Sequence, residues 1–286
     1  MALSEARTGL VHAQGSPTWI SQTKFSHGQN VVPYYEGWIP NPDGSFDLVF
    51  GYFNRNYEEE LVIPVGPDNL VEPDGTDRGQ PTYFLPRQNQ RMFRLRVPKD
   101  FGKKAVTWTL TAHGRTDKVI AELVPAYEIN EYIISSGGNA VPFGEVDENR
   151  PPTITVAPVP SVQTGVPVTL TARYADDGLP KPRPERVQTA APPAATTSPT
   201  RRAQVDKSDQ PARRGPSVTW LQYRGPAKAV FADTAPLRVQ DGQAVTTVRF
   251  SQPGVYQLRA TATDGRLSAR TDVTVTVTGA PADRQP

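Results

Sequence analysis

The sequence predicts an all-β protein made of two tandem antiparallel β-sandwiches. Its apolar runs are short, alternate with polar residues, and are rich in valine, threonine and aromatic side chains, which is the pattern of half-buried strands. The 30 prolines and 22 glycines supply frequent turns between these runs. A length of 286 residues suits two domains, and a hydrophobic fraction of 37% is low enough that parts of the chain are expected not to fold.

The composition excludes several functional classes. The formal net charge of +2 offers no field for nucleic acid, and no apolar run approaches the ~20 residues of a membrane-spanning helix. The absence of cysteine excludes disulfides, thiolate metal sites and cysteine nucleophiles. The histidines are His12, His27 and His113, so a catalytic triad or a histidine-rich zinc site is hard to assemble.

The first domain is predicted over residues 30–128, after a disordered leader over residues 1–29 that lacks periodicity. Val31–Ile39 is predicted as a strand, and Pro40–Ser45 as a turn in which Asp-Gly supplies the left-handed position. Ser45–Asn54 alternates as the second strand of a hairpin.

This hairpin lies in the densest aromatic stretch of the chain, Pro33–Asn56, which would form either a ligand platform or the inside of a sheet. Strand parity places Phe46, Phe50 and Tyr52 on one face, which we expect to be core. Three side chains remain as candidates for stacking on a ligand such as a sugar: Tyr35, Trp38 and Phe53.

The rest of the first domain is predicted as four strands around a long loop. The strands are Leu61–Val65, Arg91–Val97, Val106–Ala112 and Lys118–Val124. Residues 66–86 carry turn signals, and oxygen-bearing side chains there could bind a cation or a sugar, but we expect an ordered structural loop. These side chains are Asp68, Asn69, Glu72, Asp74 and Asp77. Residues 129–150 are predicted as a linker.

The second domain, residues 151–278, has the clearer strand pattern. Its predicted strands are Ile154–Val156, Val168–Tyr174, Val218–Gln222, Val245–Phe250, Tyr256–Ala262 and Val273–Val277. Trp220 on the third strand, and Tyr256 two residues before Leu258, are features of immunoglobulin-like sandwiches. Leu170 and Leu258 would fill the centre that a disulfide occupies in antibody domains.

A basic insertion over residues 180–216 separates the second and third of these strands. It has no aromatic residue, and its eight basic and three acidic residues give it a net charge of +5. Because it cannot bury enough apolar surface to offset the loss of chain entropy, we expect a disordered loop. A short tail over residues 279–286 follows the domain.

Several stretches resemble known families. VTWLQYRGP (Val218–Pro226), FSQPGVYQLRATATDGRLSARTDVTVTV (Phe250–Val277) and DDGLP (Asp176–Pro180) resemble the PKD-like, REJ-type immunoglobulin-fold repeat. The resemblance implies an immunoglobulin fold and an extracellular or surface role as a spacer, adhesion or binding module. EGWIPNPDGSFDLVFGYFNRN (Glu36–Asn56) and later segments resemble an uncharacterised bacterial protein family, which implies a fold and no activity.

One end of the second sandwich is a candidate calcium site. The start of the first strand, the loop after the second strand and the turn before the last strand share one end of such a sandwich. The four candidate ligands there are Asn149, Asp176, Asp177 and Asp264. Oxygen ligands from several loops suit calcium, and the resemblance implies sites near this end. The alternative is that Asp-Asp-Gly and Thr-Asp-Gly are ordinary turns. No other cofactor is expected.

We expect a non-enzymatic extracytoplasmic binding or interaction module, whose partner is a protein or a polysaccharide at the cell surface or in the periplasm. A carbohydrate-binding accessory protein and a hydrolase are the alternatives. The acidic runs Glu58–Glu60 and Asp176–Asp177 show no sign of the cleft and the opposed environments that paired catalytic carboxylates need. His113 lies in a predicted turn.

Export is expected because of the resemblance. Val11-His12-Ala13 has the small residues that a signal peptidase reads, without the apolar region that should precede them. A truncated export signal and a short leader in a cytoplasmic protein both fit this pattern.

Overall fold

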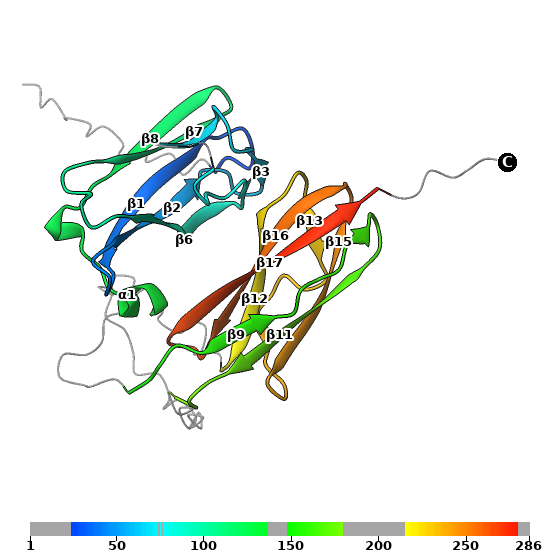
Figure 1. The fold of residues 1–286 in the computed structure, drawn as a ribbon. Helices are drawn as coiled ribbons and strands as arrows, with labels where there is room; N and C mark the ends of the chain where they lie inside the picture. The colour runs from blue at the N-terminus through cyan, green and yellow to red at the C-terminus, as the bar shows by residue number, and fades with distance from the viewer. Residues whose placement is uncertain (1–23, 74, 76, 137–147, 180–214, 280–286) are drawn as a thin grey trace, which may run out of the picture.

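The structure is a computed structural model that describes residues 24–73, 75, 77–136, 148–179 and 215–279. Within these residues the chain is all-β, and two antiparallel β-sandwiches lie side by side (Figure 1). Nearly all of the expected insertion and tail, and most of the expected leader, lie outside the described residues. No helix in the described ranges has the length and apolar character that a membrane crossing requires.

The first sandwich has two three-stranded sheets. β1 (Val31–Pro40), β2 (Phe46–Asn54) and β6 (Arg87–Val97) form one sheet, and β4 (Asn69–Glu72), β7 (Val106–Ala112) and β8 (Arg115–Ala121) form the other. β3 (Leu61–Val62) and β5 (Tyr83–Phe84) pair as a short ribbon. Phe50 stacks on Phe93 with ring centroids 4.9 Å apart, and Trp108 meets Phe93 edge-on at 4.9 Å. Phe50 and Tyr52 are buried in this core, as strand parity predicts.

Part of the predicted loop over residues 66–86 is folded into this core. β4 pairs with β7, and Asn69 is fully buried. Its amide donates to the carbonyls of Ile63 and Pro81 at 3.0 and 2.8 Å, and its oxygen accepts the Trp108 indole N–H at 3.0 Å. The prediction of one continuous loop is wrong here, because a four-residue strand among turn signals is too short to show alternation. β3 is also shorter than predicted, and β8 begins and ends three residues earlier.

Residues 25–29, expected in the leader, are fastened to the first sandwich. Backbone N–H groups of residues 57–59 donate to carbonyls in this segment at 3.0 to 3.1 Å. The Gly28 N–H donates to the Glu59 carboxylate at 2.7 Å. The Asn56 side-chain amide accepts the Gln29 N–H and donates to the Gln29 carbonyl. The boundary predicted at residue 29 is therefore too late.

The predicted linker begins with helical turns. η1 (Pro125–Tyr127) and α1 (Glu131–Ser135) follow β8, and Asn130 caps α1 by accepting the Ile133 N–H at 2.8 Å. The Ile129 N–H donates to the Trp38 carbonyl at 2.9 Å. This segment therefore lies against β1 before the chain enters the second sandwich.

The second sandwich has an immunoglobulin-like arrangement of strands. One sheet contains, in order, β13 (Ala229–Phe231), β15 (Gln243–Phe250), β11 (Val168–Ala175) and β9 (Thr153–Val156). The other contains β10 (Val162–Gln163), β17 (Ser268–Thr278), β16 (Gly254–Thr263), β12 (Ser217–Arg224) and β14 (Leu237–Arg238). All six predicted strands are present. The sequence pattern misses β10, β13 and β14, because two or three residues show no period.

The centre of the second sandwich matches the prediction. Leu170 and Leu258 are buried there, and Trp220 on β12 packs half-buried against the same core. Tyr256 forms a tyrosine corner, since its hydroxyl donates to the Gln252 carbonyl at 2.9 Å.

Candidate binding cleft between the two sandwiches

The two sandwiches touch at the end of β12. Strand alternation places Gln222 inside the second sandwich, and Leu221 and Tyr223 on its outer face. Tyr223 is nonetheless only 2% exposed, because it packs into the core of the first sandwich. The Thr82 N–H donates to the Tyr223 carbonyl at 3.3 Å, so the two units share a backbone hydrogen bond as well as a buried ring.

Ion pairs surround this junction. Arg224 makes a two-point pair with Asp77 at 2.8 and 3.0 Å, and its hydrogen bonds lower the pKa of Asp77. Lys228 pairs with Glu60 at 2.8 Å. Charged contacts therefore hold the end of β12 against the loops of the first sandwich.

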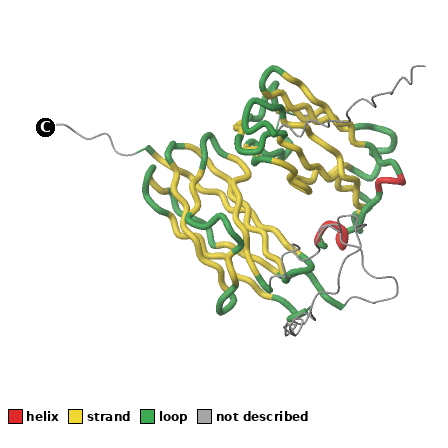
Figure 2. Tube along the Cα trace, turned by 180° about the vertical axis from the view of Figure 1, so that it is seen from behind, coloured by secondary structure: helices red, strands yellow, loops and turns green. Residues whose placement is uncertain are grey.

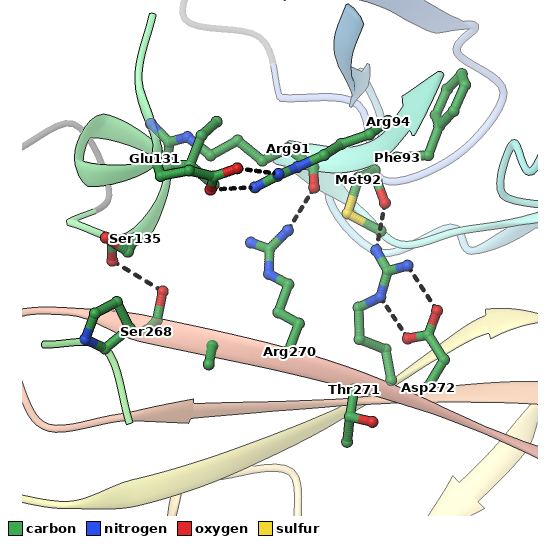
Figure 3. A pocket seen from close by; sticks show the side chains of 14 residues that line it. Arg91, Met92, Phe93, Arg94, Glu131, Ser135, Ser268, Arg270, Thr271 and Asp272 are labelled. Carbon is green, nitrogen blue, oxygen red and sulfur yellow. Dashed lines mark hydrogen bonds and ion pairs between the residues drawn. The ribbon is translucent and has the colours of Figure 1, made fainter. Parts of the chain in front are cut away.

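Beyond the junction, the facing surfaces line a cavity of about 510 Å³ (Figure 3). Its walls are β6 of the first sandwich, α1 and Pro151 of the connecting segment, and β17 with one residue of β16. Figure 2 shows from behind how the two sandwiches face each other. A cavity of this size is in the range of small-molecule sites.

An irregularity in β6 turns two carbonyls toward the second sandwich. The register between β2 and β6 shifts at this point, and Arg91 has a φ of 55°, which is uncommon for a residue with a side chain. The carbonyls of Arg91 and Met92 accept hydrogen bonds from Arg270 and Arg259. Two arginines of the second sandwich therefore donate hydrogen bonds to one bulge of the first.

Arg259 is fully engaged by neighbouring groups. It makes a two-point pair with Asp272 at 2.7 and 2.9 Å. Its guanidinium also lies 3.9 Å from the centre of the Tyr223 ring. Asp272 thus balances the charge of Arg259 on the cavity wall.

Two other arginines of the cavity have carboxylate partners. Arg94 makes a two-point pair with Glu131 of α1 at 2.5 and 2.9 Å. Arg91 lies 3.7 Å from Glu36. Burial raises the pKa of Glu36, and the Arg91 backbone and side chain act against that rise.

Arg270 forms no ion pair among the described residues. Its side chain projects from β17 into the cavity (Figure 3), where its surface is exposed although both sandwiches surround it. Burial between the two units, with Arg259 and Arg91 close by, lowers the pKa of Arg270 to about 10. Arg270 therefore has no carboxylate within ion-pair distance among the described residues, and Glu36, which lies farther away, only partly offsets its charge.

The structure brings the four candidate calcium ligands to one end of the second sandwich. The Asn149 amide donates to Asp264 at 2.9 Å, and the Arg150 N–H donates to Asp177 at 2.9 Å. Burial, with Asp264 and Asp177 nearby, raises the pKa of Asp176. The predicted proximity of these loops is thus present.

The oxygens of these carboxylates also close turns. Asp264 accepts the N–H groups of Arg266 and Leu267 at 2.5 and 2.6 Å, and Asp176 accepts the Gly178 N–H at 3.1 Å. These are contacts of ordinary Asx turns. The described residues contain no group of three or more acidic, histidine or cysteine side chains placed to hold a metal. Calcium binding at this end stays a prediction.

The three aromatic candidates do not share one open surface. Trp38 is buried, and its indole N–H donates to a backbone carbonyl at 2.8 Å. Tyr35 meets Tyr127 edge-on with ring centroids 6.0 Å apart, and Phe53 lies under the Arg87 guanidinium at 4.7 Å. Trp38 therefore has little free surface for stacking, and ligand binding by Tyr35 and Phe53 stays a prediction.

Glu59 and Glu60, which are among the candidate catalytic carboxylates, form contacts between different segments of the chain. Both oxygens of Glu59 lie 3.1 Å from Nε2 of His113. Glu60 accepts a hydrogen bond from the Tyr83 hydroxyl in addition to its pair with Lys228. These contacts are structural, because each one joins two different segments.

The strand pattern of the sequence did not predict the residues of the cleft. One signal lies in WLQYR (Trp220–Arg224), where Leu221 and Tyr223 occupy the face that a lone sandwich turns to water, while Gln222 points inward. This reversal indicates that another unit covers the outer face. The arginines of β6 and β17 carry no such signal, because arginine on the wet side of a strand is usual.

Comparison with known proteins identifies no family. No protein-family model matches the sequence, and no curated protein matches it. Titin domains Z1Z2 in complex with telethonin are 10% identical, with 87% of this chain and 97% of that chain covered and a TM-score of 0.25. Domains 4 and 5 of the S-layer protein SbsC are 13% identical, with 60% and 65% covered and a TM-score of 0.24. An endo-fucoidan hydrolase of glycoside hydrolase family 107 is 11% identical, with 91% and 28% covered and a TM-score of 0.26. The immunoglobulin-like fold of the second unit therefore rests on its strand order and tyrosine corner.

Proposed function

We propose that the chain is a non-enzymatic binding module that takes its ligand in the cleft between the two sandwiches. The observation that carries the proposal is the cavity of about 510 Å³, whose walls come from both units and from α1. Such a site requires docked sandwiches, and the buried Tyr223 ring and the Arg224–Asp77 pair hold them together. Guanidinium and hydroxyl groups on its walls suit a polar ligand.

The described residues of the cavity wall supply binding groups and no pair of a nucleophile and a base. The Ser268 hydroxyl donates to the Ser135 carbonyl at 3.0 Å, and no histidine is among the described residues of the wall. Glu131 and Asp272 are each engaged by an arginine and are not directed at one another. The arrangement therefore favours binding over hydrolysis.

The proposal includes an extracytoplasmic location and a protein or polysaccharide partner. The resemblance of Val218–Pro226 and Phe250–Val277 to PKD-like, REJ-type repeats supports both. Fractionation of the source cells tests the location, and recovery in the cytoplasm alone would contradict it.

Blocking the cleft tests the proposal. Because the chain has no cysteine, Ser268→Cys places a single thiol on the cleft wall, and Thr155→Cys places one on the exposed side of β9 as a control. Both variants are labelled with a bulky maleimide and screened on glycan and peptide arrays. We expect binding to be lost only when residue 268 carries the label. Equal binding by the two labelled proteins, or no binder on either array, contradicts the proposal.

A further inference from the structure

The geometry points to a small ligand that carries a carboxylate, which pairs with Arg270. This inference rests on the proposed function and names the class of ligand. It depends on three properties of the cleft: one guanidinium without an ion-pair partner among the described residues, a net charge that matches a single negative charge, and room beside the guanidinium for the body of the ligand.

Arg270 is the guanidinium of the cleft that the described carboxylates leave unpaired. Its hydrogen bond goes to the Arg91 carbonyl, which is a neutral acceptor. Burial and the nearby Arg259 and Arg91 lower the pKa of Arg270, and Glu36 acts against that fall. Repulsion from Arg259 and Arg91 opposes the charge of Arg270, and an anion in the cavity would offset this repulsion.

The charge balance favours an anion of charge −1. Among the described residues, the four arginines that line the cavity face three carboxylates, those of Glu131, Asp272 and the neighbouring Glu36. A carboxylate supplies the one missing negative charge. A phosphate monoester carries about −1.5 to −2 at neutral pH and would leave the cleft with excess negative charge.

The shape of the site suits a carboxylate on a polar body. A guanidinium has five N–H donors in a planar fork, and one nitrogen of Arg270 contacts the Arg91 carbonyl, so further donors remain for a carboxylate. Ser268 lies two residues before Arg270 on the same face of β17, and its hydroxyl can accept a hydrogen bond from the ligand. A volume of about 510 Å³ exceeds the needs of a bare ion.

Matched probes test the carboxylate and identify the body that bears it. Glucuronate presents a carboxylate on a sugar ring, and N-acetylglycine presents one on a peptide-like body; glucose and N-acetylglycinamide are their neutral counterparts. Each is titrated into the full chain while the arginine Nε–H signals are followed by NMR. We expect at least one acid to shift the Arg270 signal and to bind at least about tenfold more tightly than its neutral counterpart. Tighter binding of glucose 6-phosphate than of either acid, or equal binding of acids and neutral probes, overturns the inference.

Two variants complete the test. Arg270→Gln removes a cation that Arg259 and Arg91 repel, so its melting temperature should stay equal or rise, and its affinity for the acid should fall at least about tenfold. Arg115→Gln, at an exposed position on β8, should bind as the parent does. Equal acid binding by the two variants overturns the inference. Failure of the acids to bind, with an array ligand still blocked by the label at residue 268, refutes the carboxylate and leaves the proposed function standing.

Discussion

The two sandwiches reach the same architecture with different interiors. The first encloses large rings and ties its loops to them with buried amides, namely Trp108, Phe50, Phe93, Tyr52 and Phe84 with Asn54, Asn56, Asn69 and Gln80. The second is filled mainly by leucine, valine and alanine around one aromatic pair, Phe250 and Tyr256, with ring centroids 4.5 Å apart. The first interior therefore depends on particular partners, whereas the second needs an apolar residue at alternate positions.

Trp108→Ala should have the largest effect on this comparison. The indole is fully buried against Phe93 and donates to Asn69, so its loss leaves a cavity and an unpaired buried oxygen. We expect a loss of about 3–5 kcal/mol in the free energy of unfolding from truncation, with about 1–3 kcal/mol more from the orphaned oxygen. Leu258→Ala, at the centre of the second sandwich, should cost about 2–5 kcal/mol. Urea unfolding measures both, and a larger loss for Leu258→Ala would contradict the contrast.

Alkaline pH should lower the stability of the two sandwiches to different extents, because buried tyrosines resist ionisation. Burial raises the pKa of Tyr52 in the first sandwich, and it raises the pKa of Tyr223 at the junction to about 12. Below pH 10 both the folded and unfolded states keep their protons, so the stability is fully present. Above pH 10 the unfolded state releases protons that the folded state retains, so stability falls by about 1.4 kcal/mol per pH unit for each such tyrosine.

Burial also raises the pKa of Tyr174 and Tyr256 in the second sandwich, but it raises the pKa of four tyrosines in the first, namely Tyr34, Tyr35, Tyr52 and Tyr83. The first sandwich should therefore open before the second between about pH 10 and pH 12. Tyrosinate absorbance and circular dichroism, recorded together, measure ionisation and unfolding. Tyr52→Phe should make the fall in stability with pH less steep. Ionisation of every tyrosine near pH 10 without unfolding would show that the buried rings do not oppose ionisation.

The same difference explains how much the sequence could predict. Strand alternation and the tyrosine corner located six strands of the second sandwich, because each apolar position there indicates which face of its strand points to the core. Asn69 gave no such signal, since its partners are two loop carbonyls and an indole 39 residues away in the chain. The cleft is still harder to predict from the sequence. Arg270 differs from other strand arginines only in the folded protein, where β17 lies opposite the β6 bulge. Contacts between distant polar groups follow from the fold and are absent from local periodicity.

Asn69→Ala isolates the contribution of one buried amide. Removing it leaves the Ile63 and Pro81 carbonyls and the Trp108 N–H without their partner. We expect a loss of about 1–3 kcal/mol, with faster amide exchange confined to β3, β4 and the chain before β5. Gln240→Ala, at an exposed position in the second sandwich, should stay within about 0.5 kcal/mol of the parent. A loss as small as that of the control would mean that water replaces the amide.

Two matched hydroxyl deletions compare the junction with a single interior. Tyr223→Phe removes a bond from the first sandwich, where the hydroxyl donates to Gly79, and Tyr256→Phe removes the corner bond to Gln252. Each should cost about 1 kcal/mol. In a thermal melt followed by probes in each sandwich, Tyr223→Phe should lower both transitions, and Tyr256→Phe should lower mainly the second. Identical effects of the two variants would show that the sandwiches unfold as one unit.

Calcium should give the smallest effect, and only in the second sandwich. The four candidate ligands meet at one end of it, and the raised pKa of Asp176 reflects burial beside Asp264 and Asp177, a situation that a cation would relieve. Because the same oxygens already accept backbone N–H groups, binding should be weak, with a dissociation constant of the order of a millimolar. At a calcium concentration of twice that value the stabilisation is about 0.6 kcal/mol.

Asp176→Asn should abolish the rise in melting temperature that calcium causes, and magnesium should not reproduce this rise, because Mg²⁺ demands a more rigid octahedral site. An unchanged melting temperature with calcium would leave Asp176 and Asp264 as turn residues, so the acidic end would serve the fold alone.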